Sequence, residues 1–150
     1  MAISDEGSEL YVQLKSLLKI KEQYADLNVA NHEIATKLAQ SYLEKKHSEI
    51  ESWQSNPRAG AGLDISGYDS SGLRVVAEIT AHHPIQKTTT GKPRFGAQQE
   101  QRMREIVNKL LREKQAVKYL SVITDEARIA VADEIETSEI CVMSLFDLCG

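Results

Sequence analysis

The chain has 150 residues and a mass of 16.7 kDa, the size of one compact domain with its own core. Hydrophobic residues make up 41% and charged residues 27%, which excludes a disordered chain, and no run approaches the roughly 18 apolar residues of a membrane helix. Cys141 and Cys149 lack CxxC spacing, which excludes a disulfide scaffold and a cysteine-based zinc site. The first residues do not resemble a secretory signal, so we expect a cytoplasmic protein.

The formal net charge is −4, which argues against a nucleic-acid partner when it is read alone. The charges are unevenly distributed, however. Residues 85–118 carry nine Lys and Arg against three Glu, whereas the rest of the chain carries nine basic and nineteen acidic residues. A basic segment in an acidic chain is typical of a surface that faces phosphates. The alternative is a solvated helix face whose cations pair with acidic neighbours, and the pattern leaves both open.

The sequence predicts two helices at the start of the chain. The first covers residues 8–24, where leucines recur at helical spacing. Residues 25–30 predict a break, after which Asn31 caps a second helix over 31–46. We expect residues 1–30 to form a helical extension of a single domain that covers the whole chain. The expected buried stripe of the second helix consists of Ile34, Ala35, Leu38, Ala39, Tyr42 and Leu43.

A β-hairpin is predicted near the middle of the chain. Two strands, over 63–68 and 73–80, flank a segment that has Asp69 in its first position and Gly72 in its fourth. This is the chemistry of a type I turn, with Gly72 in the left-handed position of a three-residue hairpin loop. The resulting register pairs Asp69 with Leu73 and fixes the pairing of all the preceding residues.

The other elements follow from composition and periodicity. Residues 47–53 are ambiguous between a helix tail and a short strand, and the Pro and Gly content of 56–62 predicts a loop. After the hairpin, the pattern predicts a helix over 95–114, a central strand over 117–124, a short helix over 125–134 and a final strand over 140–146. This order indicates a mixed sheet with helices on its faces.

The predicted register places Asp64 directly opposite Glu78 on the polar face of the hairpin. Opposed like charges in a sheet cost stability, so something should offset them. A divalent cation would do so, because Mg²⁺ takes one or two carboxylates and fills its other positions with water and substrate phosphate. Thr80 and His82 continue the same face if the strand runs on. The alternative is a surface pair of carboxylates held apart by solvent.

At these residues the chain resembles the PD-(D/E)xK nucleases, the restriction-endonuclease-like superfamily. The resemblance rests on Gly62–Ile65 (GLDI), a hairpin, and Val76–Thr80 (VAEIT), and it covers about residues 31–124. It implies an α/β fold in which an αβββαβ core with a mixed sheet follows an extra N-terminal helix. The ambiguous stretch at 49–53 would then supply the first strand of the core.

The resemblance implies a chemical role for each residue of the motif. Asp64 and Glu78 would bind Mg²⁺, for which Mn²⁺ can substitute, and the backbone carbonyl of Ile79 would be a further ligand. Thr80 stands where the family has the lysine that activates or orients the attacking water. The implied activity is hydrolysis of DNA phosphodiester bonds by a Mg²⁺-dependent endonuclease.

Thr80 departs from the family pattern, because threonine cannot supply a positive charge or act as a base at neutral pH. Lys87, Lys92 or His82 could supply the cation instead. His82 and His83 could also be ordinary loop residues.

Two further family positions map onto the predicted helices. A glutamate of the first helix maps to Glu33, which lies roughly 100° around the helix from the expected buried stripe. A glutamine of the second helix maps to Gln98 or Gln99, and Gln99 could equally be a helix-end side chain.

Three functions remain open at this point. The first is the endonuclease, with a possible homodimer formed through the N-terminal helix. The second is a non-catalytic DNA-binding or assembly module on the same fold, which Thr80 favours. The third is a protein-interaction domain, which the net charge favours. In the first function, the expected DNA-backbone contacts are Lys87, Lys92, Arg94 and Arg102.

Overall fold

The structure is a computed structural model that describes residues 5–56, 62–135 and 138–149. The expected loop over 56–62 therefore lies largely outside the described residues. The chain divides into two compact units, Met1–Asn31 and His32–Gly150. In the part of the chain that the structure describes, no helix is both long and apolar enough to span a membrane.

One continuous helix, α1 (Asp5–Lys46), replaces the two helices that the sequence predicts. The break expected at 25–30 is wrong, because these residues include neither proline nor glycine and nothing in the backbone ends the helix there. Asn31 is consequently an ordinary helical residue. The helix ends at Lys46, as predicted.

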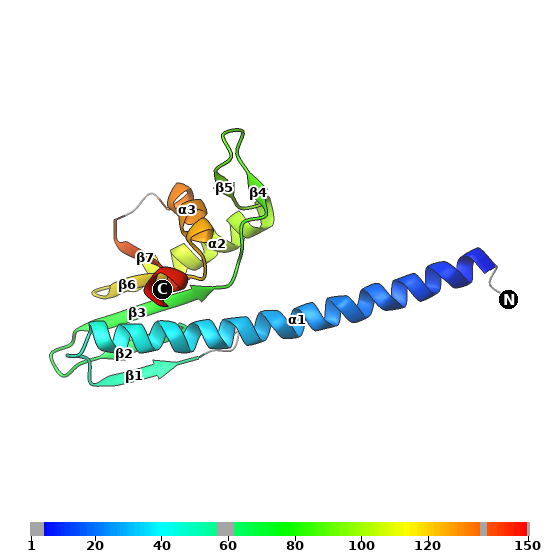
Figure 1. Ribbon diagram of the computed structural model, residues 1–150. Coiled ribbons are helices and arrows are strands. Elements are labelled where there is room, and N and C mark those ends of the chain that lie inside the picture. Colours follow the sequence, from blue (N-terminus) through cyan, green and yellow to red (C-terminus); the bar gives the residue numbers. More distant parts are fainter. Residues whose placement is uncertain (1–4, 57–61, 136–137, 150) are drawn as a thin grey trace. The chain divides into compact units, whose positions relative to one another are not determined.

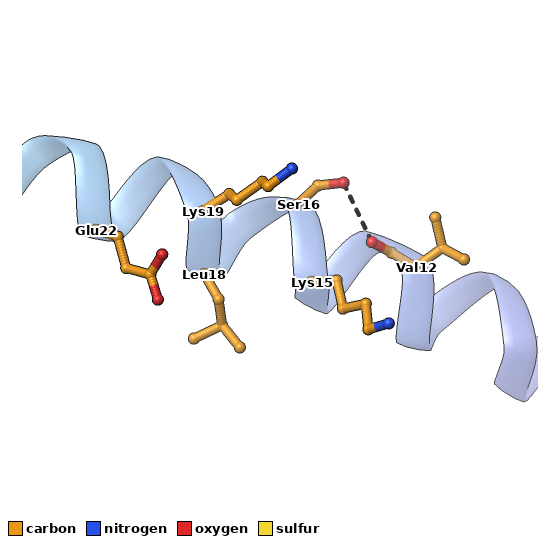
Figure 2. Close-up of a pocket in the computed structure, with 6 residues that line it drawn as sticks. All are labelled: Val12, Lys15, Ser16, Leu18, Lys19 and Glu22. Atoms are coloured by element: carbon orange, nitrogen blue, oxygen red, sulfur yellow. Dashed lines mark hydrogen bonds between the residues drawn. The ribbon is translucent and has the colours of Figure 1, made fainter.

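Large apolar side chains of the first unit are exposed on several sides of the helix. Each of them has at least 51% of its surface exposed: Leu10, Tyr11, Val12, Leu14, Leu17, Leu18, Ile20, Tyr24, Leu27 and Val29. Figure 2 shows a shallow hollow on this helix, where the Ser16 hydroxyl donates to the carbonyl of Val12 at 3.2 Å. All six residues that line the hollow come from this one helix, so it is a groove between neighbouring side chains and no enclosed binding cavity.

The second unit contains a five-stranded mixed sheet in the order β1-β2-β3-β6-β7. The first three strands pair antiparallel, and β3, β6 and β7 pair parallel. The chain therefore has the mixed α/β architecture that the sequence predicts, but the first strand begins only at the end of the ambiguous stretch, with Ser52 and Trp53, and continues to Ser55. The strands are β1 (Ser52–Ser55), β2 (Ile65–Tyr68), β3 (Arg74–Thr80), β6 (Val117–Val122) and β7 (Ile140–Ser144).

The hairpin has the predicted turn and register. The amide of Asp69 donates to the carbonyl of Leu73 at 3.1 Å, and Gly72 has a φ of 91°, which is the left-handed conformation that glycine adopts readily. Ile65 lies opposite Ala77, as the sequence requires.

Two helices follow the hairpin at the predicted places, and two smaller features were not predicted. Figure 1 shows the β4–β5 ribbon extending beyond the main sheet. Strands of two residues are too short for a periodic signal. The expected last strand ends at Ser144, where a short helix begins. These elements are α2 (Ala97–Leu111), α3 (Asp125–Glu134), β4 (Gln86–Lys87), β5 (Pro93–Arg94) and α4 (Leu145–Cys149).

The sheet has a buried cluster on each face. On one face, α2 and α3 pack on β3 and β6 around Leu120 and Met103, and on the other the last part of α1 packs around Leu43 (Figure 1). The predicted stripe of α1 is partly wrong, because Ile34 and Leu38 are 58% and 44% exposed. The predicted Ala35, Ala39 and Leu43 are buried, and Thr36, which was not predicted, joins Ala39 and Leu43 at the helical spacing i, i+3 and i+7.

Candidate functional site

The strand β2 begins one residue after Asp64, and this position explains how the Asp64 carboxylate is held. In an antiparallel pair of strands, every second pair of facing residues is joined by backbone hydrogen bonds. Counted from Asp69 and Leu73, the next such pair beyond the end of β2 would be Leu63 and Ile79. Instead, the amide of Ile79 donates to Asp64 Oδ2 at 2.8 Å. The side chain thus replaces a strand partner at the end of the ladder.

Asp64 and Glu78 are both buried, with 8% and 4% of their surfaces exposed. Burial, followed by a hydrogen bond and charge repulsion from Asp64, raises the pKa of Glu78 from 4.5 to about 8. The two carboxyl groups are therefore neighbours, and Glu78 keeps its proton at neutral pH. Their proximity agrees with the sequence prediction of a facing pair.

Lys109 of α2 reaches the Glu78 carboxyl group, a contact that the sequence did not predict. Its ammonium forms an ion pair with Glu78 Oε1 and donates to the carbonyl of Gly62 at 2.7 Å. This positive charge lowers the pKa of Glu78, but burial and Asp64 outweigh it. Lys109 follows Ile106 by one helical turn and lies at the edge of the buried stripe of α2. This spacing is the feature of the sequence that could have identified Lys109 as a site residue.

The contact from α1 to Asp64 comes from His32. Its Nε2 lies 3.5 Å from Asp64 Oδ2, and its backbone carbonyl accepts a hydrogen bond from the Thr36 hydroxyl at 2.8 Å. Glu33, to which the resemblance assigns the family glutamate, is half-buried, and its side chain makes no hydrogen bond or ion pair with the described residues.

The side chains of Thr80 and Gln99 are used in local structure. Thr80 is buried, and its Oγ1 accepts from the amide of His82 at 3.3 Å. Gln99 Oε1 accepts from the amide of Gly96 at 3.1 Å, and Gln99 Nε2 donates to the carbonyl of His83 at 2.8 Å. Gln99 therefore fixes the start of α2, which is the helix-end role that the sequence analysis left open.

His82 does not supply the missing positive charge. Burial and, to a lesser extent, the nearby Arg102 guanidinium lower the pKa of His82, so its imidazole is neutral at pH 7.

The candidate DNA-contacting residues mostly pair with acidic neighbours. Their side chains are exposed, and exposed ion pairs contribute little stability, so phosphates could replace the carboxylates. Lys87 forms no ion pair with any described residue. The three pairs are Lys92 with Asp133 at 2.6 Å, Arg94 with Glu100 at 3.5 Å, and Arg102 with Glu105 at 3.2 Å.

Asp64 and Glu78 fit a divalent cation in ligand type and number. Among the residues that the structure describes, no group of three or more His, Cys, Asp and Glu side chains is arranged to hold a metal ion. Mg²⁺ needs only one or two carboxylates, because it keeps water molecules and accepts substrate oxygens. The buried pair also lacks enough positive charge to keep both acids ionised at neutral pH, which a cation would provide.

Comparisons with protein-family models, with curated proteins and with solved structures found no match to the chain.

Proposed function

We propose that the chain is a Mg²⁺-dependent DNA endonuclease in which Asp64 and Glu78 bind the metal ion and Mn²⁺ can replace it. The observation that carries this proposal is the buried contact between the two carboxyl groups, with the ammonium of Lys109 beside them. Two acids with a lysine beside them are the residue types that the resemblance to the PD-(D/E)xK superfamily implies.

The order of the elements supports the same proposal. From α1 the chain continues through the antiparallel strands β1, β2 and β3, the short β4–β5 ribbon and α2 to β6. Apart from the ribbon, this is the αβββαβ order that the resemblance implies.

Each residue of the site has a defined task in this proposal. When bound, Mg²⁺ would polarise the scissile phosphate and lower the pKa of a bound water. Glu78 would release its proton on binding the metal, since a metal ligand must be deprotonated. Asp64 is held in place by the amide of Ile79. Lys109 would supply the positive charge that Thr80 cannot, and would orient the attacking water or a phosphate oxygen.

Contacts to the DNA backbone would come from Lys87, Lys92, Arg94 and Arg102. Their affinity for DNA would fall with salt concentration, because binding to phosphates releases counterions. Charge reversal at Lys92 and Arg94 would reduce the slope of that dependence.

A non-catalytic module that binds DNA or assembles with other chains is the second candidate. Thr80 favours it, and so does the ion pair between Lys109 and Glu78, because a cluster that already holds its own cation can be purely structural.

A plasmid-nicking assay with Mg²⁺ or Mn²⁺ distinguishes the two candidates. The parent should nick supercoiled DNA, and Asp64→Asn or Lys109→Met should reduce the rate by a factor on the order of 100 or more. The exposed Lys114, changed to Met, is the matched control. The double variant Lys109→Met/Thr80→Lys, which moves the lysine from the helix to the strand, should recover part of the activity. A parent that nicks no DNA with either metal would favour the non-catalytic module.

A further inference from the structure

We infer that His32 is a positioning residue for the metal ligand Asp64, and that it raises the affinity of the site for a divalent cation. This inference rests on the proposed function, since it concerns the same carboxylate pair.

The geometry holds Asp64 from two directions through a single oxygen. Oδ2 accepts from the amide of Ile79 at 2.8 Å and lies 3.5 Å from His32 Nε2. The first contact comes from the sheet and the second from α1. Together they restrict the rotation of the carboxylate, which the backbone contact alone would limit less.

The position of His32 on α1 is fixed by packing. His32 belongs to the row that continues through Thr36, Ala39 and Leu43, and these three side chains are buried against the sheet. The imidazole itself is one-quarter exposed, so it lies at the rim of the buried face, where the site meets solvent. Glu33 lies one residue further around the helix and makes no contact with Asp64 through a hydrogen bond or an ion pair.

A group that orients a ligating carboxylate contributes to metal binding without touching the metal. Loss of such an outer partner typically weakens metal affinity by 10- to 100-fold. His32 would act in this way, by donating from Nε2 to Asp64 and keeping its second oxygen directed toward the ion. The effect should depend on an N–H donor at this place and should not require an imidazole.

Mn²⁺ binding provides the test, measured by electron paramagnetic resonance on the full chain at one fixed pH. We expect His32→Ala to bind Mn²⁺ about tenfold more weakly than the parent. His32→Gln, which can place an amide N–H near the former Nε2, should stay within about threefold of the parent. Ser41→Ala, at an exposed position of the same helix, is the matched control and should bind Mn²⁺ like the parent. A general effect on folding would not be rescued by glutamine.

Asp64→Ala separates the two levels of the inference. If the parent and Asp64→Ala bind Mn²⁺ equally weakly, the carboxylate pair is not a metal site, and the proposed function fails together with the role of His32. If Asp64→Ala loses binding but His32→Ala binds like the parent, the metal site stands and the inference about His32 is overturned. Should His32→Ala fail to fold, His32→Asn, whose shorter side chain cannot reach Asp64, takes its place in the same comparison.

Discussion

Two polar clusters of the second unit, one half-buried and the other buried, differ in how their charges are balanced. In one, His47 lies between Glu49 and Tyr119, with Nδ1 3.1 Å from Glu49 Oε1 and Nε2 2.8 Å from the Tyr119 hydroxyl. In the other, Asp64 and Glu78 are two acids in contact. The first cluster joins donors to acceptors, whereas the second brings two acidic groups together.

This difference separates a structural cluster from a candidate site. A neutral imidazole has one donor and one acceptor, so the contacts of His47 need nothing from outside the protein. Asp64 and Glu78 can both be ionised only if positive charge is added or the pH is raised, even with Lys109 beside them. Buried groups with strongly shifted pKa values are frequent at functional sites, and the three predictions below test whether this imbalance exists.

The largest expected effect is a loss of stability with rising pH that depends on Glu78. Its pKa of about 8 in the folded protein exceeds the ordinary value of 4.5, so the folded protein keeps a proton that the unfolded chain releases. The stabilisation of the folded protein by this proton is complete below about pH 4.5 and is lost as the pH rises through about 8. Over that range the free energy of unfolding falls by at most about 1.4 kcal/mol per pH unit.

Urea unfolding of the parent and of Glu78→Gln between pH 5 and pH 9 measures this loss, because glutamine does not titrate. As the pH rises to about 8, the free energy of unfolding of the parent should fall steadily relative to that of Glu78→Gln. A constant difference over this range would contradict the shifted pKa. Tyr119→Phe, in the balanced cluster, should keep the pH dependence of the parent.

A smaller effect is expected from removing the cation of the unbalanced cluster. Lys109→Met keeps the apolar stem but leaves Glu78 without its ion pair, so at pH 9 the free energy of unfolding should fall by about 1 to 2 kcal/mol. The expected loss is below that of a fully buried pair, because one-third of the Lys109 side chain is exposed. Lys114→Met is the control and should change the stability little. Equal stability of the two variants would show that Lys109 does not stabilise the carboxylate pair.

The sequence predicts the contacts that are set by local geometry. The register of the hairpin depends on Asp69 and Gly72, which lie in one short turn, and the proximity of Asp64 and Glu78 follows from that register. The β-branched and apolar residues of β6 likewise predict an interior strand, which the structure confirms.

Contacts between distant elements could not be predicted in the same way. Lys109 and His32 reach the carboxylates from two helices, and their positions depend on how each helix packs on the sheet. The stripe expected on α1 placed Ile34 and Leu38 inside, and this shift of the buried face hid the role of His32. Lys109 also lies 29 positions from Thr80 in the sequence, so only the packing of α2 on the sheet brings it to Glu78.

The smallest expected effect belongs to the balanced cluster. Tyr119→Phe removes the hydroxyl that meets His47 Nε2 and keeps the ring, which packs edge-on against the imidazole with centroids 5.6 Å apart. The free energy of unfolding should fall by about 1 kcal/mol, the usual net contribution of one hydrogen bond. Thermal unfolding should show the same loss with and without Mn²⁺, because neither partner belongs to the carboxylate pair. If Mn²⁺ stabilised the parent but not Tyr119→Phe, the two clusters would be coupled, and the distinction between a structural cluster and a binding site would fail.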